Sequence, residues 1–262
     1  DLRITTLAAD PSNAQTLFAG AGTRVYRSLN AGGAWTEVPV AARAGELAAF
    51  AVHPRDRNQM FAAFRPGAGA STACGFYRSR DAGRTWQQQS VRLTPTGPSR
   101  LNFCAASFLT DAAAASPAFV VGEEGIFRLQ GEAESDWLRA SSVEGLVQAA
   151  ADPANFDVWY GVASAGVLRS VDRGATWDVH APGARQMAIR AGQIITDRDL
   201  NPPVAQTMRS LAIDPANASN IYMGFDFLPD LYVAKISPRG DQIVFASYLG
   251  GDGDETSPRI DA

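Results

Sequence analysis

The stretch Ser170-Val171-Asp172-Arg173-Gly174-Ala175-Thr176-Trp177 decides the fold, because near-copies recur at Ser28–Trp35 and Ser79–Trp86, each after a short alternating apolar run. We call these eight residues the turn motif. In such a motif the Asp accepts backbone N–H groups, the Gly supplies a positive φ, and the hydroxyls tie the two flanking strands together. The motif therefore predicts a hairpin turn whose closing Trp is buried between sheets. Its recurrence predicts a repeat protein.

The three copies of the motif differ in how complete they are. Their positions are Ser28, Asn30, Gly32 and Trp35; Ser79, Asp81, Gly83, Thr85 and Trp86; and Ser170, Asp172, Gly174, Thr176 and Trp177. The first copy carries Asn30 in place of Asp and Ala34 in place of Thr. A fourth candidate stretch keeps only its Trp137, so we expect a differently built turn there.

Around each motif the chain repeats one plan: a strand, an Asp-Pro-x-Asn turn, two further strands, the motif and a closing strand. Residues 1–40, 41–92, 93–142, 143–182 and 205–251 form five such units, with a connector at 183–204 and a polar tail at 252–262. The sequence contains 24 Gly and 15 Pro, which favour many short strands over long helices. We therefore predict an all-β chain of a single domain or fragment, built as a solenoid or a propeller.

Composition argues against two classes of partner. The 23 basic and 27 acidic side chains give a formal charge of −4, too near balance to attract nucleic acid or an anionic membrane. No apolar stretch approaches the roughly 20 residues that a membrane-spanning helix requires. We expect no nucleic-acid partner and no membrane insertion.

The motif resembles the Asp-box, or BNR, repeat of sialidases, sortilin-type receptors and xyloglucan hydrolases. This resemblance covers roughly residues 1–182 and implies a β-propeller of four-stranded antiparallel blades, with about five blade units and a ring that need not be complete. Unit five instead resembles the bacterial seven-bladed propeller (SBBP) repeat, through Asp230–Asp241 and Phe245–Glu255. In that family such a segment leads into a further blade, so the resemblance implies a piece of a longer polypeptide.

In a propeller, the turns between strands two and three lie on the face opposite the turn motif, and such loops commonly carry function. Glu123, Asp199 and Asp226 are predicted on this loop face, where two carboxyls could serve as general acid and base in glycoside hydrolysis. Arg65, Glu124, Arg198 and Asp230 are candidates for ligand binding on the same face. The alternative interpretation of all seven is solvated loop charge.

The two cysteines, Cys74 and Cys104, lie near one face of adjacent units, so a disulfide is a candidate that implies an oxidising compartment. Two buried thiols are the alternative. His53 and His180 have no further ligand at zinc spacing, and Asp252, Asp254 and Glu255 lack the full calcium-loop pattern. We predict no metal and no cofactor.

Three functional hypotheses remain. We favour a secreted, non-enzymatic propeller, located outside the cell, on its surface or in the periplasm, that binds a protein or a glycan. The alternative is an Asp-box glycoside hydrolase that acts on a polysaccharide. A third hypothesis is a spacer within a large surface protein.

Overall fold

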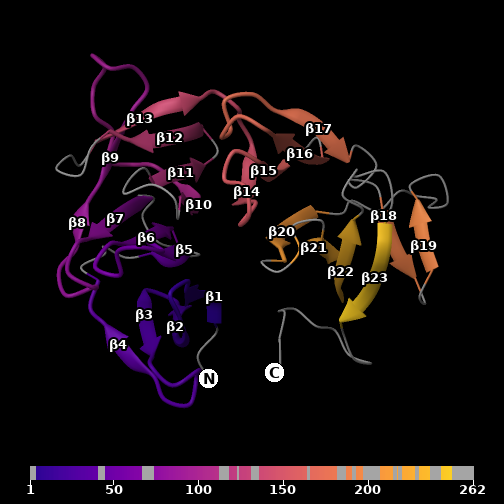
Figure 1. Cartoon of the computed structure of the whole chain (residues 1–262), viewed down its shortest axis with the longest axis horizontal. Coiled ribbons are helices and arrows are strands. Elements are labelled where there is room, and N and C mark those ends of the chain that lie inside the picture. Colours follow the sequence, from indigo (N-terminus) through magenta and orange to yellow (C-terminus); the bar gives the residue numbers. More distant parts are fainter. Residues whose placement is uncertain are drawn as a thin grey trace. The chain divides into compact units, whose positions relative to one another are not determined.

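The computed structural model contains only β-strands as regular elements within the part of the chain it describes (Figure 1). The described residues are 4–40, 45–66, 74–111, 118–122, 124–130, 136–163, 166–181, 187–190, 193–196, 207–214, 217, 220–227, 230–236 and 243–249. The prediction of an all-β chain is confirmed. Over these same ranges, no helix is long and apolar enough to cross a membrane.

The strands form five antiparallel four-stranded meanders, which we call blades 1 to 5. Blade 1 contains β1 (Ile4–Asp10), β2 (Asn13–Ala21), β3 (Arg24–Ser28) and β4 (Thr36–Val38); blade 2 contains β5 (Glu46–Val52), β6 (Met60–Arg65), β7 (Gly75–Ser79) and β8 (Gln87–Gln88). Blade 3 contains β10 (Ala105–Thr110), β11 (Ala118–Gly122), β12 (Gly125–Leu129) and β13 (Asp136–Ser141); blade 4 contains β14 (Leu146–Ala151), β15 (Trp159–Ala163), β16 (Gly166–Ser170) and β17 (Asp178–Ala181). Blade 5 contains β20 (Thr207–Ile213), β21 (Ile221–Phe227), β22 (Asp230–Ile236) and β23 (Ile243–Leu249).

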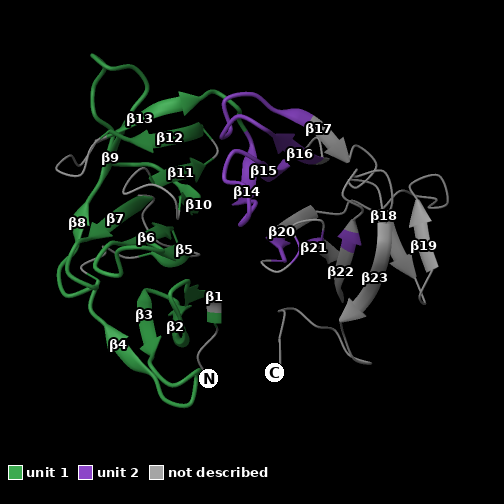
Figure 2. Ribbon diagram, in the orientation of Figure 1, with its two compact units in different colours: residues 1–144 green, residues 145–262 purple. Residues whose placement is uncertain are grey.

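The chain divides into two compact units, residues 1–144 and residues 145–262 (Figure 2). Unit 1 holds blades 1 to 3, and unit 2 holds blades 4 and 5. Unit 2 also holds a two-stranded hairpin of β18 (Met187–Arg190) and β19 (Gln193–Thr196). This hairpin lies in the stretch for which the sequence predicted only a connector.

The core of unit 1 follows from the alternation of side chains along β6, whose residues point in turn to opposite faces of the sheet. Met60, Ala62 and Phe64 pack toward blade 1, in a cluster with Phe18 and Val25. The intervening Phe61 and Ala63 pack toward blade 3, against Phe76 and Trp137 among others. Because blade 2 is buried on both faces, it joins the other two blades into one unit.

Blade 3 has a fifth strand that the repeat pattern of the sequence does not predict. The short strand β9 (Ser90–Arg92) leaves blade 2 and pairs in parallel with β13. Just before β9, the Gln89 side-chain oxygen accepts a hydrogen bond from the Trp137 indole N–H at 3.2 Å, and Trp137 is fully buried. The turn between β12 and β13, for which a different structure was expected, lies outside the described residues, but Trp137 is more deeply buried than the Trp residues of the motifs.

Hydrogen bonds within the turn itself hold the complete copies of the turn motif. In blade 2, Asp81 accepts bonds from the Ser79 hydroxyl at 2.8 Å and from the Thr85 amide and hydroxyl at 2.8 and 2.6 Å. The Ser79 hydroxyl oxygen also accepts the Gly83 amide at 2.9 Å, and Gly83 has a φ of 85°. The Thr85 hydroxyl and amide are the main cause that lowers the pKa of Asp81 to about 2. Asp172 in blade 4 has the same partners, and its pKa is lowered in the same way.

Two details of the predicted motif are wrong. The Ser hydroxyls close the turn rather than joining its two flanking strands, because their partners lie two and four residues along the chain. The Trp is not fully buried between sheets: Trp35 is 39% exposed, and Trp86 and Trp177 are half-buried. The physical reason is that the indole lies along its own turn, where the Trp86 N–H donates to the Gly83 carbonyl at 3.1 Å.

Candidate functional site

Most side chains of the predicted loop-face site lie outside the part of the chain that the structure describes. Glu123, Arg198 and Asp199 lie outside the described residues. Asp226 and Asp230 belong to β21 and β22, but their side chains lie outside the described part of the structure. The proposed carboxylate pair therefore stays a prediction.

Arg65 and Glu124 are both exposed. Arg65 ends β6. Glu124 lies in the turn between β11 and β12 and pairs with Arg100, whose guanidinium nitrogen is 3.1 Å from the carboxylate. Arg139 donates to the Glu124 carbonyl at 2.6 Å and lies 3.5 Å from the carboxylate of Glu144. Glu124 is thus part of a local ion-pair network on blade 3.

The cysteines are joined. Cys74 and Cys104 form a disulfide with a Cα–Cα distance of 4.9 Å. The Cys74 amide donates to the side chain of Asn102 at 2.9 Å. The bond fastens the end of the loop before β7 to the segment that leads into β10, and so links blade 2 to blade 3.

Unit 1 also has a cleft of about 500 Å³ on the face that carries the turn motifs. It lies between blades 1 and 2, where the turns that join first and second strands meet the ends of the third strands. This volume falls within the roughly 300–1,000 Å³ of small-ligand pockets. Its lining is Asp10, Thr16, Phe18, Arg27, Leu29, Arg55, Asp56, Arg57, Asn58, Met60 and Ala82.

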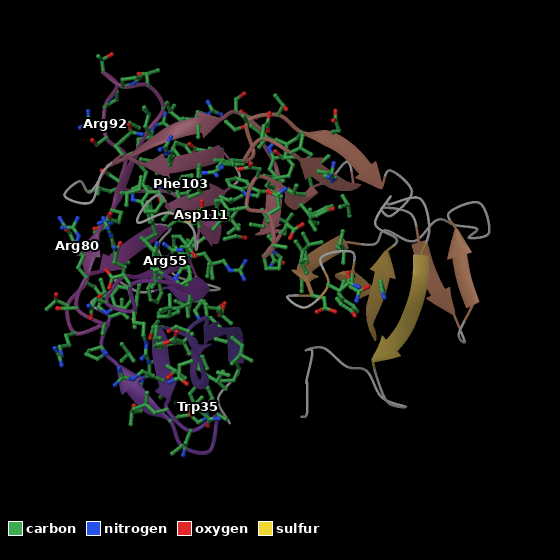
Figure 3. The ribbon with its side chains drawn as sticks, viewed as in Figure 1. Trp35, Arg55, Arg80, Arg92, Phe103 and Asp111 are labelled. Carbon is green, nitrogen blue, oxygen red and sulfur yellow. A yellow bond between two sulfur atoms is a disulfide. The ribbon has the colours of Figure 1, made fainter. Side chains whose placement is uncertain are left out.

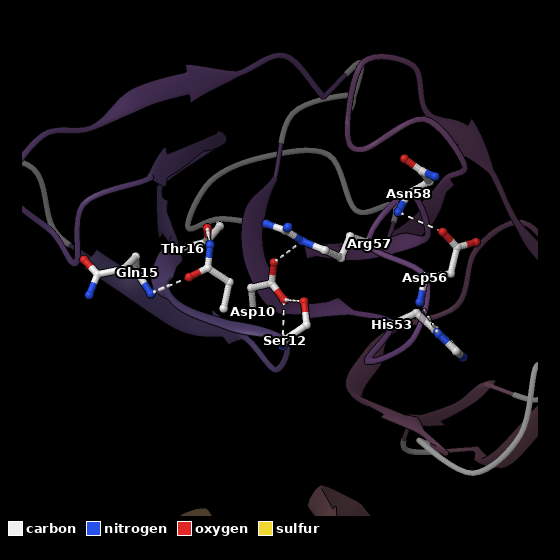
Figure 4. Close-up of polar contacts among 9 residues, drawn as sticks. Asp10, Ser12, Gln15, Thr16, His53, Asp56, Arg57 and Asn58 are labelled. Atoms are coloured by element: carbon white, nitrogen blue, oxygen red, sulfur yellow. Dashed lines mark hydrogen bonds and ion pairs between the residues drawn. The ribbon is translucent and has the colours of Figure 1, made fainter.

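An ion pair between blade 1 and blade 2 joins the two walls of the cleft (Figure 4). The Arg57 guanidinium donates to the Asp10 carboxylate at 2.9 Å, and the Asp10 side chain is only 2% exposed. Burial alone would raise the pKa of Asp10, but bonds from the Ser12 hydroxyl and amide, together with Arg57, lower it. Asp10 is therefore ionised, with its charge balanced by Arg57.

Blade 2 contributes the turn after β5 to the cleft, and this turn carries Arg55 as well as Arg57 (Figure 3). His53 takes the place of the turn Asp here, and its Nδ1 accepts the amides of Arg55 and Asp56 at 3.3 and 3.2 Å. Burial is the main cause that lowers the pKa of His53, which keeps the ring neutral and able to accept. Asp56 in turn accepts the Asn58 amide at 3.0 Å and the Gln59 amide group at 3.1 Å.

The cleft is more cationic than the chain as a whole. Three arginines and two aspartates line it, whereas the full sequence has a net charge of −4. Among described residues, no carboxylate lies within ion-pair distance of Arg27 or Arg55, and the buried Nε of Arg27 has no hydrogen-bond partner. Over the same residues, no group of three His, Cys, Asp or Glu side chains could hold a metal ion.

Sequence reasoning missed this cleft because it looked for function on the opposite face. One signal was available: an Arg recurs near the end of the third strand in blades 1 to 4, before the motif Ser in blades 1, 2 and 4 and before Leu129 in blade 3. The residue two positions before its cross-strand partner is not constant, however, since Gln59 in blade 2 corresponds to Thr16 in blade 1.

Comparison with known structures identifies the fold class as a β-propeller, as predicted. The chain is similar to an ancestral GH74 enzyme, with a TM-score of 0.58, 16% identity, and coverage of 94% of this chain and 32% of that one. It is similar to YCF48 bound to a D1 peptide, with a TM-score of 0.55, 12% identity, and coverage of 97% and 83%. It is also similar to a chain in the outer coat vertex of COPII on membranes, with a TM-score of 0.54, 12% identity, and coverage of 95% and 65%. At these identities the likeness shows the fold.

Sequence comparison adds one relative. A xyloglucanase of Hypocrea jecorina (strain QM6a) is 31% identical over 90 residues, which cover 34% of this chain. The match spans 10% of the relative, so the chain corresponds to a small part of that enzyme's length. No protein-family model matches the chain.

Proposed function

We propose that this chain is a non-enzymatic β-propeller module of a larger secreted or cell-surface protein and that it binds a protein or a glycan. The observation that carries the proposal is the cleft between blades 1 and 2, where Arg27, Arg55 and Leu29 are presented in a pocket of ligand size. Similar propellers occur in a GH74 enzyme, in a peptide-bound protein and in a coat, so the fold itself is compatible with binding and with catalysis.

Three of the described aspartates are structural groups of turns and are not candidates for the acid of a glycosidase. A glycosidase needs one carboxyl that keeps its proton near neutral pH. Asp10, Asp81 and Asp172 are instead held ionised, since hydrogen bonds lower the pKa of each. Their roles are to accept backbone and hydroxyl groups in turns.

We also assign the turn motif to the Asp-box repeat and blade 5 to the SBBP repeat. The shared hydrogen-bond pattern of Asp81 and Asp172 supports the first assignment, and the sequence of β22 and β23 supports the second. Both repeats, and the disulfide between Cys74 and Cys104, fit a secreted bacterial protein.

The alternative is a glycoside hydrolase in which Glu123, Asp199 and Asp226 supply the acid and base. The partial match to a xyloglucanase favours this candidate. A reducing-sugar assay on xyloglucan and a panel of other polysaccharides separates the two functions. The binding module should retard polysaccharide or capture peptide without releasing reducing ends. Release that is lost in Glu123→Gln or Asp226→Asn would establish the hydrolase and overturn our proposal.

A further inference from the structure

In blades 2 and 4, the Arg before the motif Ser has a partner within its own blade. In blade 2, Arg78 donates to the side-chain oxygen of Gln59 at 2.6 Å and lies 5.9 Å from the centre of the Phe61 ring. In blade 4, Arg169 contacts Tyr160 both through its ring and through its hydroxyl, at 3.4 Å. In these two blades the guanidinium is a structural group.

Arg27 occupies the same place in blade 1 but lacks that partner. It is opposite Phe18 across the β2–β3 pair, as Arg78 is opposite Phe61 across β6–β7. Two residues before Phe18, Thr16 takes the place of Gln59, and its hydroxyl accepts a bond from Asn13 at 3.1 Å instead. A shorter side chain has thus replaced the acceptor that Arg78 has in Gln59, and Arg27 lines the cleft.

The carboxylates of the cleft do not supply the missing acceptor. Asp10 is shared by Ser12 and Arg57, and Asp56 by Asn58 and Gln59. With Asp10 paired to Arg57, the lining holds the two guanidinium groups of Arg27 and Arg55 against the one remaining carboxylate, Asp56, which forms no ion pair with either among the described residues. Two guanidinium groups in one pocket form charge-assisted, often bidentate, hydrogen bonds with carboxylates.

The apolar part of the lining indicates what carries that carboxylate. Leu29 is 62% exposed beside the cleft, whereas the one aromatic residue of the lining, Phe18, is 1% exposed. A sugar ring is held best against an open aromatic face, which this lining does not offer. An aliphatic side chain of the ligand can pack on Leu29, and the removal of both apolar side chains from water favours binding.

We propose that the cleft between blades 1 and 2 binds an acidic peptide segment, with a carboxylate held by Arg27 and Arg55 and a neighbouring aliphatic side chain packed on Leu29. This inference rests on the proposed binding function and gives it a ligand class. It also places the ligand on the face of the turn motifs, opposite the loop face predicted from the sequence.

The test is fluorescence anisotropy of the full chain with a fluorescein-labelled peptide of alternating Glu and Leu residues spaced by Gly. The peptide with Gln for Glu is the control ligand. We expect Arg27→Gln and Arg55→Gln each to weaken binding about tenfold, the loss expected for a charge-assisted hydrogen bond. Arg128→Gln removes the exposed Arg at the same repeat position of blade 3 and should change the affinity less than about twofold. Raising the salt concentration should weaken the wild-type interaction.

Equal affinity for both peptides, or equal affinity of Arg27→Gln, Arg55→Gln and Arg128→Gln, would overturn the assignment of the cleft. Because Arg55 is exposed on a turn, its variant tests the site even if Arg27→Gln fails to fold. Polygalacturonate serves as an anionic glycan. If it binds in an Arg27-dependent manner and the peptide does not, the peptide proposal is wrong, while the proposed binding function stands.

Discussion

Ser79→Ala removes the hydroxyl that accepts two backbone amides in the turn motif of blade 2. The Ser79 oxygen accepts the amides of Asp81 and Gly83, at 3.3 and 2.9 Å, and donates to Asp81 at 2.8 Å. Both Ser79 and Gly83 are buried, so the Gly83 amide loses its partner where water cannot replace it. A buried donor left unsatisfied costs about 1–3 kcal/mol, and the lost hydrogen bond itself about 1 kcal/mol. We expect a loss of about 2–3 kcal/mol.

Ser28→Ala in blade 1 provides the matched comparison. The Ser28 hydroxyl accepts the Gly32 amide at 2.8 Å, a bond as short as that in blade 2, but Gly32 is only half-buried. Water can reach its amide after the substitution, so we expect a loss of about 1 kcal/mol. Ser142→Ala, at an exposed position of the same unit, should stay within about 0.5 kcal/mol of the wild type.

Urea denaturation followed by tryptophan fluorescence and circular dichroism measures all three variants against the wild type. Equal losses for Ser79→Ala and Ser28→Ala would refute the desolvation argument, because the burial of Gly83 and the charged acceptor Asp81, in place of Asn30, both predict the larger loss at Ser79. A Ser79→Ala protein as stable as Ser142→Ala would show that the motif does not stabilise the blade.

Three further predictions concern unit 1. Trp137→Ala should lower the free energy of unfolding by about 3–5 kcal/mol, whereas Trp35→Ala, at 39% exposure, should cost clearly less in the same urea titration. Because the folded pKa of His53 is lowered from its ordinary 6.5, stability should be fully present above about pH 6.5 and fall below it; His53→Asp should flatten midpoints measured between about pH 5 and 7.5. Replacing Cys74 and Cys104 together by Ala opens a crosslink of 30 residues and should cost about 3–4 kcal/mol by chain entropy, and unchanged thermal melting would contradict this.

The parts of the fold that the sequence predicted are those determined by local bonds. The side-chain hydrogen bonds of Ser79 and Asp81 in blade 2 join residues two to four positions apart, so the turn is largely determined within the stretch Ser79–Trp86. The pairing of β9 with β13 depends instead on contacts such as that between Gln89 and Trp137, 48 residues apart. No local pattern in the sequence distinguishes Gln89 from its exposed neighbours.

The candidate site was harder to predict for the same reason. Acidic residues in loops, such as Glu123, are visible in the sequence, and their roles remain predictions. The significance of Arg27 depends on a side chain that is missing across the strand pair, and on Arg55 from the next blade. Neither relation has a signature within one unit of the repeat.

The junction of blades 1 and 2 is where two departures from the repeat coincide. Thr16 stands where blade 2 has Gln59, which leaves Arg27 without that acceptor, and His53 stands where blade 1 has Asp10, so the turn that carries Arg55 lacks a buried carboxylate. Both departures lower the number of acceptors available to the arginines, and the bond of Arg57 to Asp10 holds the two walls together. In a repeat protein, the other copies show which residue stabilises the fold at each position. Two departures from that residue meet at one pocket and leave its arginines with too few acceptors. A ligand explains this better than a gain in stability does. The double substitution Thr16→Gln with His53→Asp should therefore keep the fold and weaken binding of the acidic peptide.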